Sequence, residues 1–382
     1  MPQVAIFIGT RPEAIKMAPV IKALQRDGDL SPLVVSTGQH REMLQQVIDL
    51  FDLPVDKSLD VMAPNQTLAG LTARLMTSID AFLENHRPDF ALVQGDTTTV
   101  FVAALACFYR QVPVGHVEAG LRTGNMRAPF PEEANRRLAT LLMDLHFPPT
   151  EYGRENLLRE GVNDATITVT GNTVIDALQI EVENQERPDV AALIDAALRR
   201  ELGHDWCTVP FILVTGHRRE NFGGGFENIC AALAVLAKRY PGHRFIYPVH
   251  LNPKVSGPVH DALGGIENIR LIPPKNYRLF VALMKHCTLV LTDSGGVQEE
   301  APGLGKPVLV MRDTTERPEG VKAGTVKLVG AMRESIVVEV SHLLDDDAAY
   351  RRMSEAINPY GDGQAAGRIV DILRRRLLRE GD

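Results

Sequence analysis

Ser294, Gly295 and Gly296 follow the apolar run LVLT and form a loop of the kind that binds phosphate. Ser294 suits the N-cap of a helix expected over 297–304, and glycines without a Cβ let a ligand approach the free N–H groups at the helix start. The helix dipole favours an anion at the same place. We therefore expect a phosphate or diphosphate here, with the Glu300 carboxylate about one turn further on to bind a ribose diol. The alternative is a simple tight turn followed by a solvated helix face.

Three carboxylates and one histidine stand near the ends of apolar runs, and these residue types perform acid and base catalysis. Asp96 follows FALVQG, Glu118 follows VGHV, Glu132 lies in a loop expected over 117–136, and His217 follows FILVTG. Two carboxylates in different surroundings can act as acid and base at neutral pH, and a histidine titrates near neutrality. The set therefore predicts proton transfer to or from a substrate.

Each of these residues also has a structural interpretation, which the sequence leaves open. Asp96 could be the N-cap of the next helix, and a lone histidine is more often a hydrogen-bonded structural residue. Glu118 and Glu132 could be ion-pair partners of Arg122 and Arg136. We interpret the following histidines as structural: His40, His116, His146, His250 and His260.

Polar residues gather at the expected carboxyl ends of the strands, where open α/β sheets bind their ligands. The first half of the chain supplies Arg11, Lys16, Asp96, Glu118, Arg122, Glu132, Glu133 and Arg136. The second half supplies His217, Arg218, His250, Ser294, Gly295, Gly296, Glu300, Arg312 and Arg317. Two domains that face each other with these edges would enclose a deep, charged cleft.

Apolar runs alternate with segments of helical periodicity, which predicts an α/β fold with doubly wound parallel sheets. The expected strands are 4–8, 33–36, 90–94, 112–116, 145–148, 211–215, 244–248, 269–272, 289–292 and 308–311. A mostly helical stretch, 172–202, breaks at Pro188 and separates the two series. Because 382 residues exceed what one core usually holds, we expect two domains, 1–172 and 173–363, with a C-terminal helix 364–382 packing back on the first.

The composition is that of an ordinary globular protein and argues against several classes of function. Hydrophobic residues make up 45% and charged residues 23%, and a net charge of -7 disfavours a dedicated nucleic-acid or membrane binder. The four cysteines lack CxxC or zinc-type spacing, so we interpret them as reduced core thiols of a cytoplasmic protein without an export signal. Since GxGxxG and clustered metal ligands are absent from the sequence, we expect neither a nicotinamide cofactor nor a metal.

A series of short motifs runs through nearly the entire chain. They are GTRPEAIKMAP (9–19), QHREML (39–44), GDTTT (95–99), GHVEAGLRTG (115–124), PEEANRR (131–137), GNTVIDAL (171–178), TGHRREN (215–221), YPVHLNP (247–253), TDSGGVQEEAP (292–302), GKPVLVMRDTTERPEG (305–320) and NPYGDGQA (358–365). In this order they resemble the non-hydrolysing UDP-N-acetylglucosamine 2-epimerases of bacteria. The resemblance implies the glycosyltransferase-B fold, in which two Rossmann-like domains face each other across the active site, and usually a homodimer.

The resemblance also assigns roles to residues of this sequence. The positions that match the catalytic set are Asp96, Glu118, Glu132 and His217, without a departure among them. The positions that match the UDP-sugar site are Arg11, Lys16, Arg136, Lys275, Phe280, Ser294, Gly295, Gly296, Glu300 and Arg317. Residues 294–296 fall at the diphosphate, Glu300 at the ribose, and residues 275 and 280 at the uracil. Bacterial members often bind a second UDP-N-acetylglucosamine as an activator, and the matching positions are Gln39, Arg218 and His250.

The chemistry that the resemblance implies is reversible epimerisation at carbon 2 of UDP-N-acetylglucosamine. UDP leaves to give 2-acetamidoglucal and then adds back to give UDP-N-acetylmannosamine, a precursor of cell-surface polysaccharides. The alternatives are an epimerase of another UDP-2-acetamido sugar, a hydrolysing relative, a glycosyltransferase of the same fold and a nucleotide-sugar sensor without turnover. The acidic set favours an epimerase, because neither a glycosyltransferase nor a sensor needs it.

Overall fold

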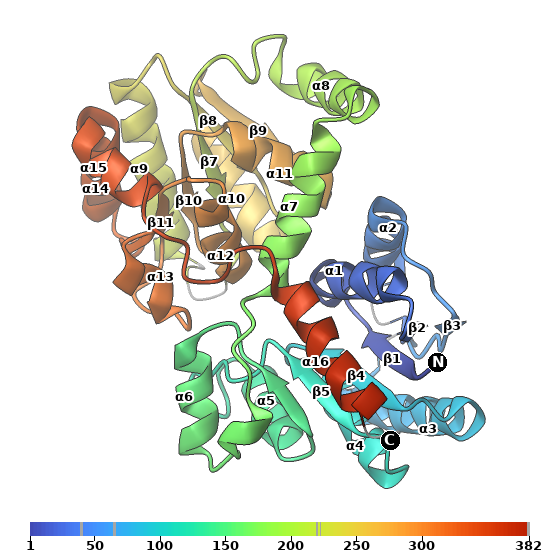
Figure 1. Ribbon diagram of the computed structural model, residues 1–382. Coiled ribbons are helices and arrows are strands. Elements are labelled where there is room, and N and C mark those ends of the chain that lie inside the picture. The colour runs from blue at the N-terminus through green and yellow to red at the C-terminus, as the bar shows by residue number, and fades with distance from the viewer. Residues whose placement is uncertain (39–40, 64–65, 219–220, 222, 380–382) are drawn as a thin grey trace. The chain divides into compact units, whose positions relative to one another are not determined.

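A computed structural model describes residues 1–38, 41–63, 66–218, 221 and 223–379, and Figure 1 traces the chain through its two units. The first unit comprises Met1–Ala177 and Tyr360–Asp382, and the second comprises Leu178–Pro359. The chain therefore leaves the first unit once and returns to it near its C-terminus.

Buried apolar runs form the parallel sheet of the first unit, whose strand order is β3-β2-β1-β4-β5-β6. The strands are β1 (Gln3–Ile8), β2 (Ser31–Ser36), β3 (Lys57–Ser58), β4 (Phe90–Gln94), β5 (Val114–Val117) and β6 (Leu145–Phe147). Strands β4 and β5 are buried along their whole length, which is why they read as continuous apolar runs. The strand order reverses between β1 and β4, so the loops after these two strands flank the point where such sheets bind ligands.

Helices α1 to α5 of the first unit connect its parallel strands, and the other helices follow the last strand. They are α1 (Arg11–Asp27), α2 (Arg41–Phe51), α3 (Leu68–His86), α4 (Thr98–Tyr109), α5 (Glu132–Thr140), α6 (Glu151–Arg159), the 3-10 helix Asp164–Thr166, the start of α7 (Thr173–Gln185) and α16 (Ala365–Arg379). The last of these packs against α1, and Arg374 forms an ion pair of 2.9 Å with Asp27.

Glu13 joins the two loops at the point where the first sheet changes direction. Its Oε2 accepts the N–H groups of Gly9 and Thr10 at 2.9 and 2.6 Å, and its Oε1 accepts the Thr97 hydroxyl at 2.6 Å. Burial raises the pKa of Glu13, against the effect of these hydrogen bonds. The loop after β1 and the loop after β4 are therefore held together by one buried carboxyl group.

The sheet of the second unit repeats the arrangement of the first, with the strand order β12-β11-β10-β7-β8-β9. The strands are β7 (Phe211–Thr215), β8 (Arg244–Pro248), β9 (Ile269–Ile272), β10 (Leu289–Thr292), β11 (Val308–Val310) and β12 (Val326–Leu328). The helices are the rest of α7, α8 (Pro188–Leu202), α9 (Gly224–Arg239), α10 (Pro253–Leu263), α11 (Tyr277–His286), α12 (Gly295–Gly303), α13 (Pro318–Ala323), α14 (Arg333–Asp345) and α15 (Asp347–Ser354). Here the order reverses between β7 and β10, so the loops after these strands flank the corresponding point.

The predicted α/β fold with doubly wound parallel sheets is confirmed in both units. The short strands β3 and β12 were not predicted, because two or three residues carry no measurable periodicity. The expected loop over 117–136 is wrong at its end, since α5 already begins at Glu132. The interpretation of the cysteines as core thiols is wrong for Cys207, which is exposed, whereas Cys107, Cys230 and Cys287 are buried and all four are free. Among the described residues, none of the helices is both long and apolar enough to span a membrane.

Candidate active site

Glu118 lies directly after β5, and its carboxylate accepts hydrogen bonds from several side chains of the first unit. Its backbone is left-handed, with φ of 64°, although it is not a glycine, and the residue is only 8% exposed. Lys16, from α1, donates to both carboxylate oxygens at 2.6 and 2.7 Å, and the Gln94 side chain at the end of β4 donates to Oε2. The suggested ion pair with Arg122 is wrong, because that guanidinium binds Glu160 instead, at 2.7 and 2.9 Å.

Asp96 lies in the loop after β4 and is fixed by α5. Arg136 donates to its Oδ2 from Nε at 2.9 Å and from Nη2 at 2.6 Å, and Asn135 donates to its backbone carbonyl at 2.9 Å. The suggested N-cap role of Asp96 is wrong, because Thr97 is the N-cap of α4 and accepts the N–H of Val100. The Asp96 carboxylate is therefore held in the loop after β4, the strand that pairs with β1.

Glu132 and Glu133 are adjacent in α5 but differ in their surroundings. Glu133 is fully buried, pairs with Arg136 at 3.0 Å and accepts the N–H groups of Thr123 and Gly124, so it supports the preceding loop. Oε2 of Glu132 is buried without a hydrogen-bond partner among the described residues. Arg136, which was suggested as the ion-pair partner of Glu132, pairs with Glu133 instead. Glu132 therefore has one carboxylate oxygen to which no described residue donates a hydrogen bond.

His116 and His146, interpreted as structural, occupy paired positions in β5 and β6. His116 Nε2 lies 2.7 Å from the carbonyl oxygen of Gly95, in the loop that carries Asp96. Burial lowers the pKa of both histidines to about 4, so both are neutral at physiological pH. The neutral His116 imidazole therefore holds the loop that carries Asp96 without adding a charge to it.

The loop after β10 carries the three residues expected at a diphosphate. Ser294 is the N-cap residue of α12, although its side chain makes no capping bond, and α12 starts at Gly295, two residues earlier than expected. A Cβ on Gly295 would lie 2.5 Å from Nη1 of Arg317, whereas one on Gly296 would meet only Oε2 of Glu300, at 3.7 Å. Gly295 is therefore required for the close approach of the arginine, and Gly296 leaves the helix start open.

Arg317 belongs to a buried network of alternating charges. Its Nε donates to Glu299 at 2.5 Å and its Nη1 to Glu316 at 2.7 Å, and Glu316 also accepts from Arg312 at 2.9 Å. Burial pushes the pKa of Glu316 up, but the charges of Arg317 and Arg312 outweigh it and lower the pKa to about 2. Arg317 is thus held in a fixed position beside the start of α12.

Glu300 has a partner that the sequence analysis missed. The hydroxyl group of Tyr277, the first residue of α11, donates to Oε1 of Glu300 at 2.8 Å, and both residues are buried. Burial and the nearby carboxylate raise the pKa of Tyr277 far above its usual value, so the phenol keeps its proton. The donated bond fixes one carboxylate oxygen of Glu300, and the position of Tyr277 between residues 275 and 280 is the sequence signal that could have found it.

Asp293 joins the two loops at the point where the second sheet changes direction. It is fully buried, and its Oδ2 accepts the backbone N–H groups of His217 and Arg218, each at 2.8 Å. Nδ1 of His217 lies 3.3 Å from Oδ1 of Asp293, and the imidazole stacks on that of His250 with ring centroids 5.6 Å apart. The histidine side chain is 39% exposed, so it is oriented by a carboxylate and still open to a ligand.

The remaining predicted residues are less well connected to these clusters. Arg11 is the first residue of α1, beside the loop after β1. Lys275 pairs with Glu201 of α8, with Nζ 2.5 and 2.7 Å from its oxygens, and Phe280 is half-buried on α11. Gln39, expected at an activator site, lies outside the described residues.

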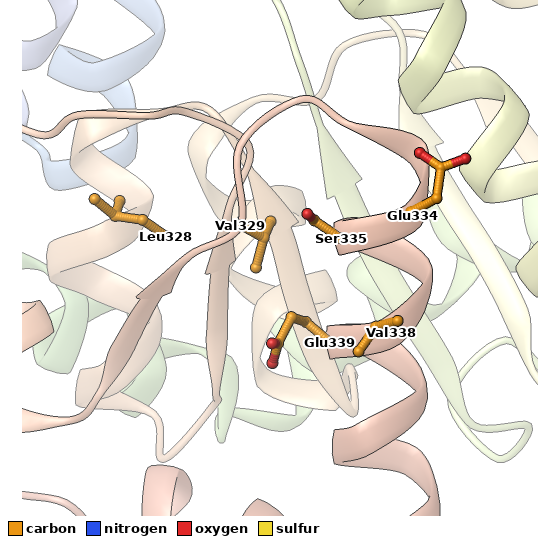
Figure 2. A pocket seen from close by; sticks show the side chains of 6 residues that line it. All are labelled: Leu328, Val329, Glu334, Ser335, Val338 and Glu339. Atoms are coloured by element: carbon orange, nitrogen blue, oxygen red, sulfur yellow. The ribbon is translucent and has the colours of Figure 1, made fainter.

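Figure 2 shows a hollow of about 320 Å³ on the second unit that shares no residue with the predicted site. Its lining residues come from the end of β12, the residue that follows it and α14: Leu328, Val329, Glu334, Ser335, Val338 and Glu339. Among the described residues, no group of three or more histidine, cysteine, aspartate or glutamate side chains is arranged to hold a metal ion.

Comparisons with known proteins agree with one another. The family described as UDP-N-acetylglucosamine 2-epimerase matches residues 22–374. A protein of Ralstonia nicotianae named probable UDP-N-acetylglucosamine 2-epimerase is 54% identical over 381 residues, which are 98% of this chain and 99% of the relative. The UDP-N-acetylglucosamine 2-epimerase of Escherichia coli strain K12 is 53% identical over 380 residues, with the same shares covered. The crystal structure of the UDP-GlcNAc 2-epimerase from Neisseria meningitidis bound to UDP-GlcNAc is similar with a TM-score of 0.91 and 48% identity, covering 98% of this chain and 100% of that chain.

Proposed function

This chain belongs to the UDP-N-acetylglucosamine 2-epimerase family, and we propose that it interconverts UDP-N-acetylglucosamine and UDP-N-acetylmannosamine. The observation that carries the proposal is Glu118, a buried carboxylate in a left-handed conformation that Lys16 and Gln94 hold in place. Such a conformation costs of order 1–3 kcal/mol and persists only where the surrounding structure enforces it, which is often the case at active sites. A carboxylate held in this way is the group that inversion of a carbon centre by proton transfer needs.

The reaction proceeds by elimination and readdition. A carboxylate removes the proton from carbon 2, the C1–O bond breaks with its electron pair leaving on UDP, and a C1–C2 double bond forms in 2-acetamidoglucal. An oxygen of UDP then attacks carbon 1 while a proton is delivered to the opposite face of carbon 2. Asp96, Glu118 and Glu132 supply the acid and base groups, because all three belong to loops or helix starts at the carboxyl edge of the first sheet.

The second task is to stabilise the departing diphosphate. The start of α12 offers the backbone N–H groups of Gly295 and Gly296, and the positive end of the helix dipole favours the charge that develops there. The N–H of Ser294 already donates to the Thr292 hydroxyl at 2.9 Å. Arg11, Lys16, Arg136, His217 and Arg317 complete the polar contacts to the UDP-sugar. Glu300, whose Oε1 accepts the Tyr277 hydroxyl, binds the ribose, and Lys275 and Phe280 hold the uracil.

The experiment that tests this function is incubation of the protein with UDP-N-acetylglucosamine in D2O, without added nicotinamide, followed by proton NMR. We expect UDP-N-acetylmannosamine to grow to a constant ratio while deuterium enters carbon 2 of both sugars. Appearance of free N-acetylmannosamine and UDP would instead identify a hydrolysing enzyme. Release of UDP that depends on an added acceptor would identify a glycosyltransferase, and an unchanged sugar would remove this substrate from consideration.

We further propose that the protein is a homodimer through an apolar patch on the first unit. The patch consists of Phe108 and Tyr109 at the end of α4 and Leu138 and Leu141 at the end of α5, which are between 44% and 77% exposed. The two helices pack against each other and follow neighbouring parallel strands, so their ends lie at the same edge of the sheet. Exposed apolar groups gathered in this way are typical of protein interfaces.

Replacing Leu141 by glutamate, Leu141→Glu, is expected to convert the dimer into a monomer, because a charge would be buried in the apolar interface. The molar mass measured by light scattering after size-exclusion chromatography should fall by half. Leu193→Glu is the matched control, since Leu193 is 65% exposed on α8 of the second unit. If the wild-type protein already has the mass of one chain, the dimer proposal is wrong.

Two further proposals concern regulation and location. A second UDP-N-acetylglucosamine acts as an activator through Gln39, Arg218 and His250, and the stacking of the His250 ring on His217 supports a link from this group to the catalytic set. The protein acts in the cytoplasm, which four free cysteines support. We also propose that two domains perform the reaction, 1–172 with the C-terminal segment 364–382, and 173–363, whereas the compact units divide after Ala177 and before Tyr360.

A further inference from the structure

Asn172 lies five residues before the end of the first unit's main segment, and it is hydrogen-bonded to the segment by which the chain returns to this unit. The backbone N–H of Asn172 donates to the carbonyl oxygen of Tyr360 at 2.6 Å. A Cβ on Gly171, whose φ is 90°, would lie 3.4 Å from the Cα of Gly361, so the two backbones are in contact. The outgoing and the returning segments are therefore fastened to each other inside the first unit.

A second bond strengthens this junction from the two helices that follow it. Asp176 lies in the first turn of α7, and its Oδ1 accepts the N–H of Ala366, in the first turn of α16, at 2.8 Å. We call residues 171–176 and 360–366 together the junction. All of these residues belong to the first unit, next to the two points where the chain passes to and from the second.

The side chain of Asn172 is oriented by its own backbone neighbourhood. Its Oδ1 accepts the N–H of Val174 at 3.1 Å, and the residue is only 2% exposed. Because a backbone N–H can only donate, the atom that faces Val174 must be the amide oxygen. The amide nitrogen therefore points the other way, where its nearest carboxylate oxygen is Oε1 of Glu118 at 3.4 Å.

Glu118 thus receives hydrogen bonds from three different parts of the first unit. Lys16 comes from α1, Gln94 from the end of β4, and Asn172 from the junction. The Lys16 ammonium group brings a positive charge, whereas the side-chain amides of Gln94 and Asn172 are neutral donors that orient the carboxylate plane. Of these three donors, Asn172 alone lies on the segment that leads from one unit to the other.

We propose that Asn172 is a positioning residue, whose amide group holds the Glu118 carboxylate in its reactive orientation and ionised state from the junction. Asn172 does not touch the substrate. It makes the orientation of the Glu118 carboxylate depend on the junction. The inference rests on the proposed catalytic role of Glu118.

The test is the substitution Asn172→Asp, which keeps the size of the side chain and the acceptor for the Val174 N–H but replaces the donor by an oxygen. A second carboxyl group beside Glu118 favours its protonated form, because the two groups then share a proton. We expect kcat to fall at least about tenfold and KM to change little. The acidic limb of the pH–rate profile should move up by about one pH unit.

Asn163→Asp is the matched control for this substitution. Asn163 lies in the same unit, and its Oδ1 likewise accepts the N–H two residues ahead, from Ala165 at 3.1 Å, but its side chain faces solvent. The control should leave kcat and the pH–rate profile unchanged, while thermal unfolding of both variants shows that they fold. A loss of kcat in Asn172→Asp with an unmoved acidic limb would mean a merely structural role and would overturn the proposal.

A measurement without substrate separates this inference from the proposed function. The titration midpoint of the Glu118 carboxyl group can be followed by ¹³C NMR of protein labelled at glutamate Cδ, with the signal identified by its absence in Glu118→Gln. In Asn172→Asp the midpoint should rise, and an unchanged midpoint would overturn the positioning role. If the wild-type protein does not convert UDP-N-acetylglucosamine, the proposed function fails, and the titration still decides what Asn172 does.

Discussion

The substitution Glu118→Gln is expected to lower kcat for epimerisation by about 10²–10⁴-fold, the usual contribution of a positioned acid or base. Glutamine keeps the shape of the side chain and can still accept a hydrogen bond from Lys16, but it cannot take up a proton from carbon 2. The rate is measured by NMR detection of UDP-N-acetylmannosamine. Incorporation of deuterium at carbon 2 should fall by the same factor, because it reports the same proton transfer.

Binding of UDP provides the internal control for this variant, because the proposed UDP contacts are mainly on the second unit. The dissociation constant of UDP, measured by calorimetry, should stay within about twofold of the wild-type value. Glu160→Gln is the matched variant in the first unit, since Glu160 also lies in an ion pair, with Arg122 at 2.7 Å, but outside the proposed site. It should cost stability and leave kcat unchanged. A Glu118→Gln protein that epimerises at the wild-type rate would exclude this carboxylate from catalysis.

The substitution Gly295→Ala is expected to destabilise the second unit and to weaken UDP binding at least about tenfold. The new Cβ would lie 2.5 Å from Nη1 and 2.8 Å from Cζ of Arg317, so the guanidinium must move. It cannot move freely, because Glu299 and Glu316 hold it at 2.5 and 2.7 Å and the residue is 8% exposed. Strain of this kind in a packed site typically costs about 1–3 kcal/mol, which denaturant unfolding without ligand should detect.

Gly296→Ala is the matched variant, and it separates the effect on packing from the effect on the ligand. Its Cβ meets only Oε2 of Glu300, at an ordinary contact distance of 3.7 Å. Alanine is also a better helix former than glycine by about 0.8–1.0 kcal/mol, so the protein without ligand should be at least as stable as the wild type. UDP should nevertheless bind more weakly, because the methyl group stands where the diphosphate approaches the helix start. If both variants bind UDP as the wild type does, the diphosphate does not lie at this loop.

Sequence reasoning located the loops of the candidate site well, because the signals are local. An apolar run that ends in Asp-Ser-Gly-Gly, or in Gly-Asp-Thr, indicates a strand and its exit loop without knowledge of any distant residue. The structure brings Lys16 to Glu118, Asp96 to Arg136, and Gly295 to Arg317, all of them pairs within the predicted set. The fold class followed in the same way from the alternation of strands and helices.

Sequence reasoning did not pair these residues with their partners, because the partners come from distant parts of the chain. Tyr277 reaches Glu300 across 23 residues, and Asn172 reaches Glu118 across 54. The ion pair of Arg122 with Glu160 was assigned to the wrong carboxylate for the same reason, since nearness in sequence does not fix which side chains meet. The left-handed backbone at Glu118 is likewise invisible in a sequence, where only a glycine signals such a conformation.

The alternating charges around Arg317 have a consequence for the protein in a cell that contains much inorganic phosphate. Because Glu299 and Glu316 already satisfy the guanidinium, a small anion that arrives at the start of α12 meets a neutralised arginine rather than a free positive charge. Such an anion gains the helix dipole and a few N–H groups, but little Coulomb energy. A nucleotide offers in addition ribose hydroxyl groups that can donate to the Glu300 carboxylate, whereas a fully ionised phosphate has no proton to donate. If the proposed diphosphate site is correct, we therefore expect the loop to bind free phosphate weakly and a ligand that carries a ribose more tightly.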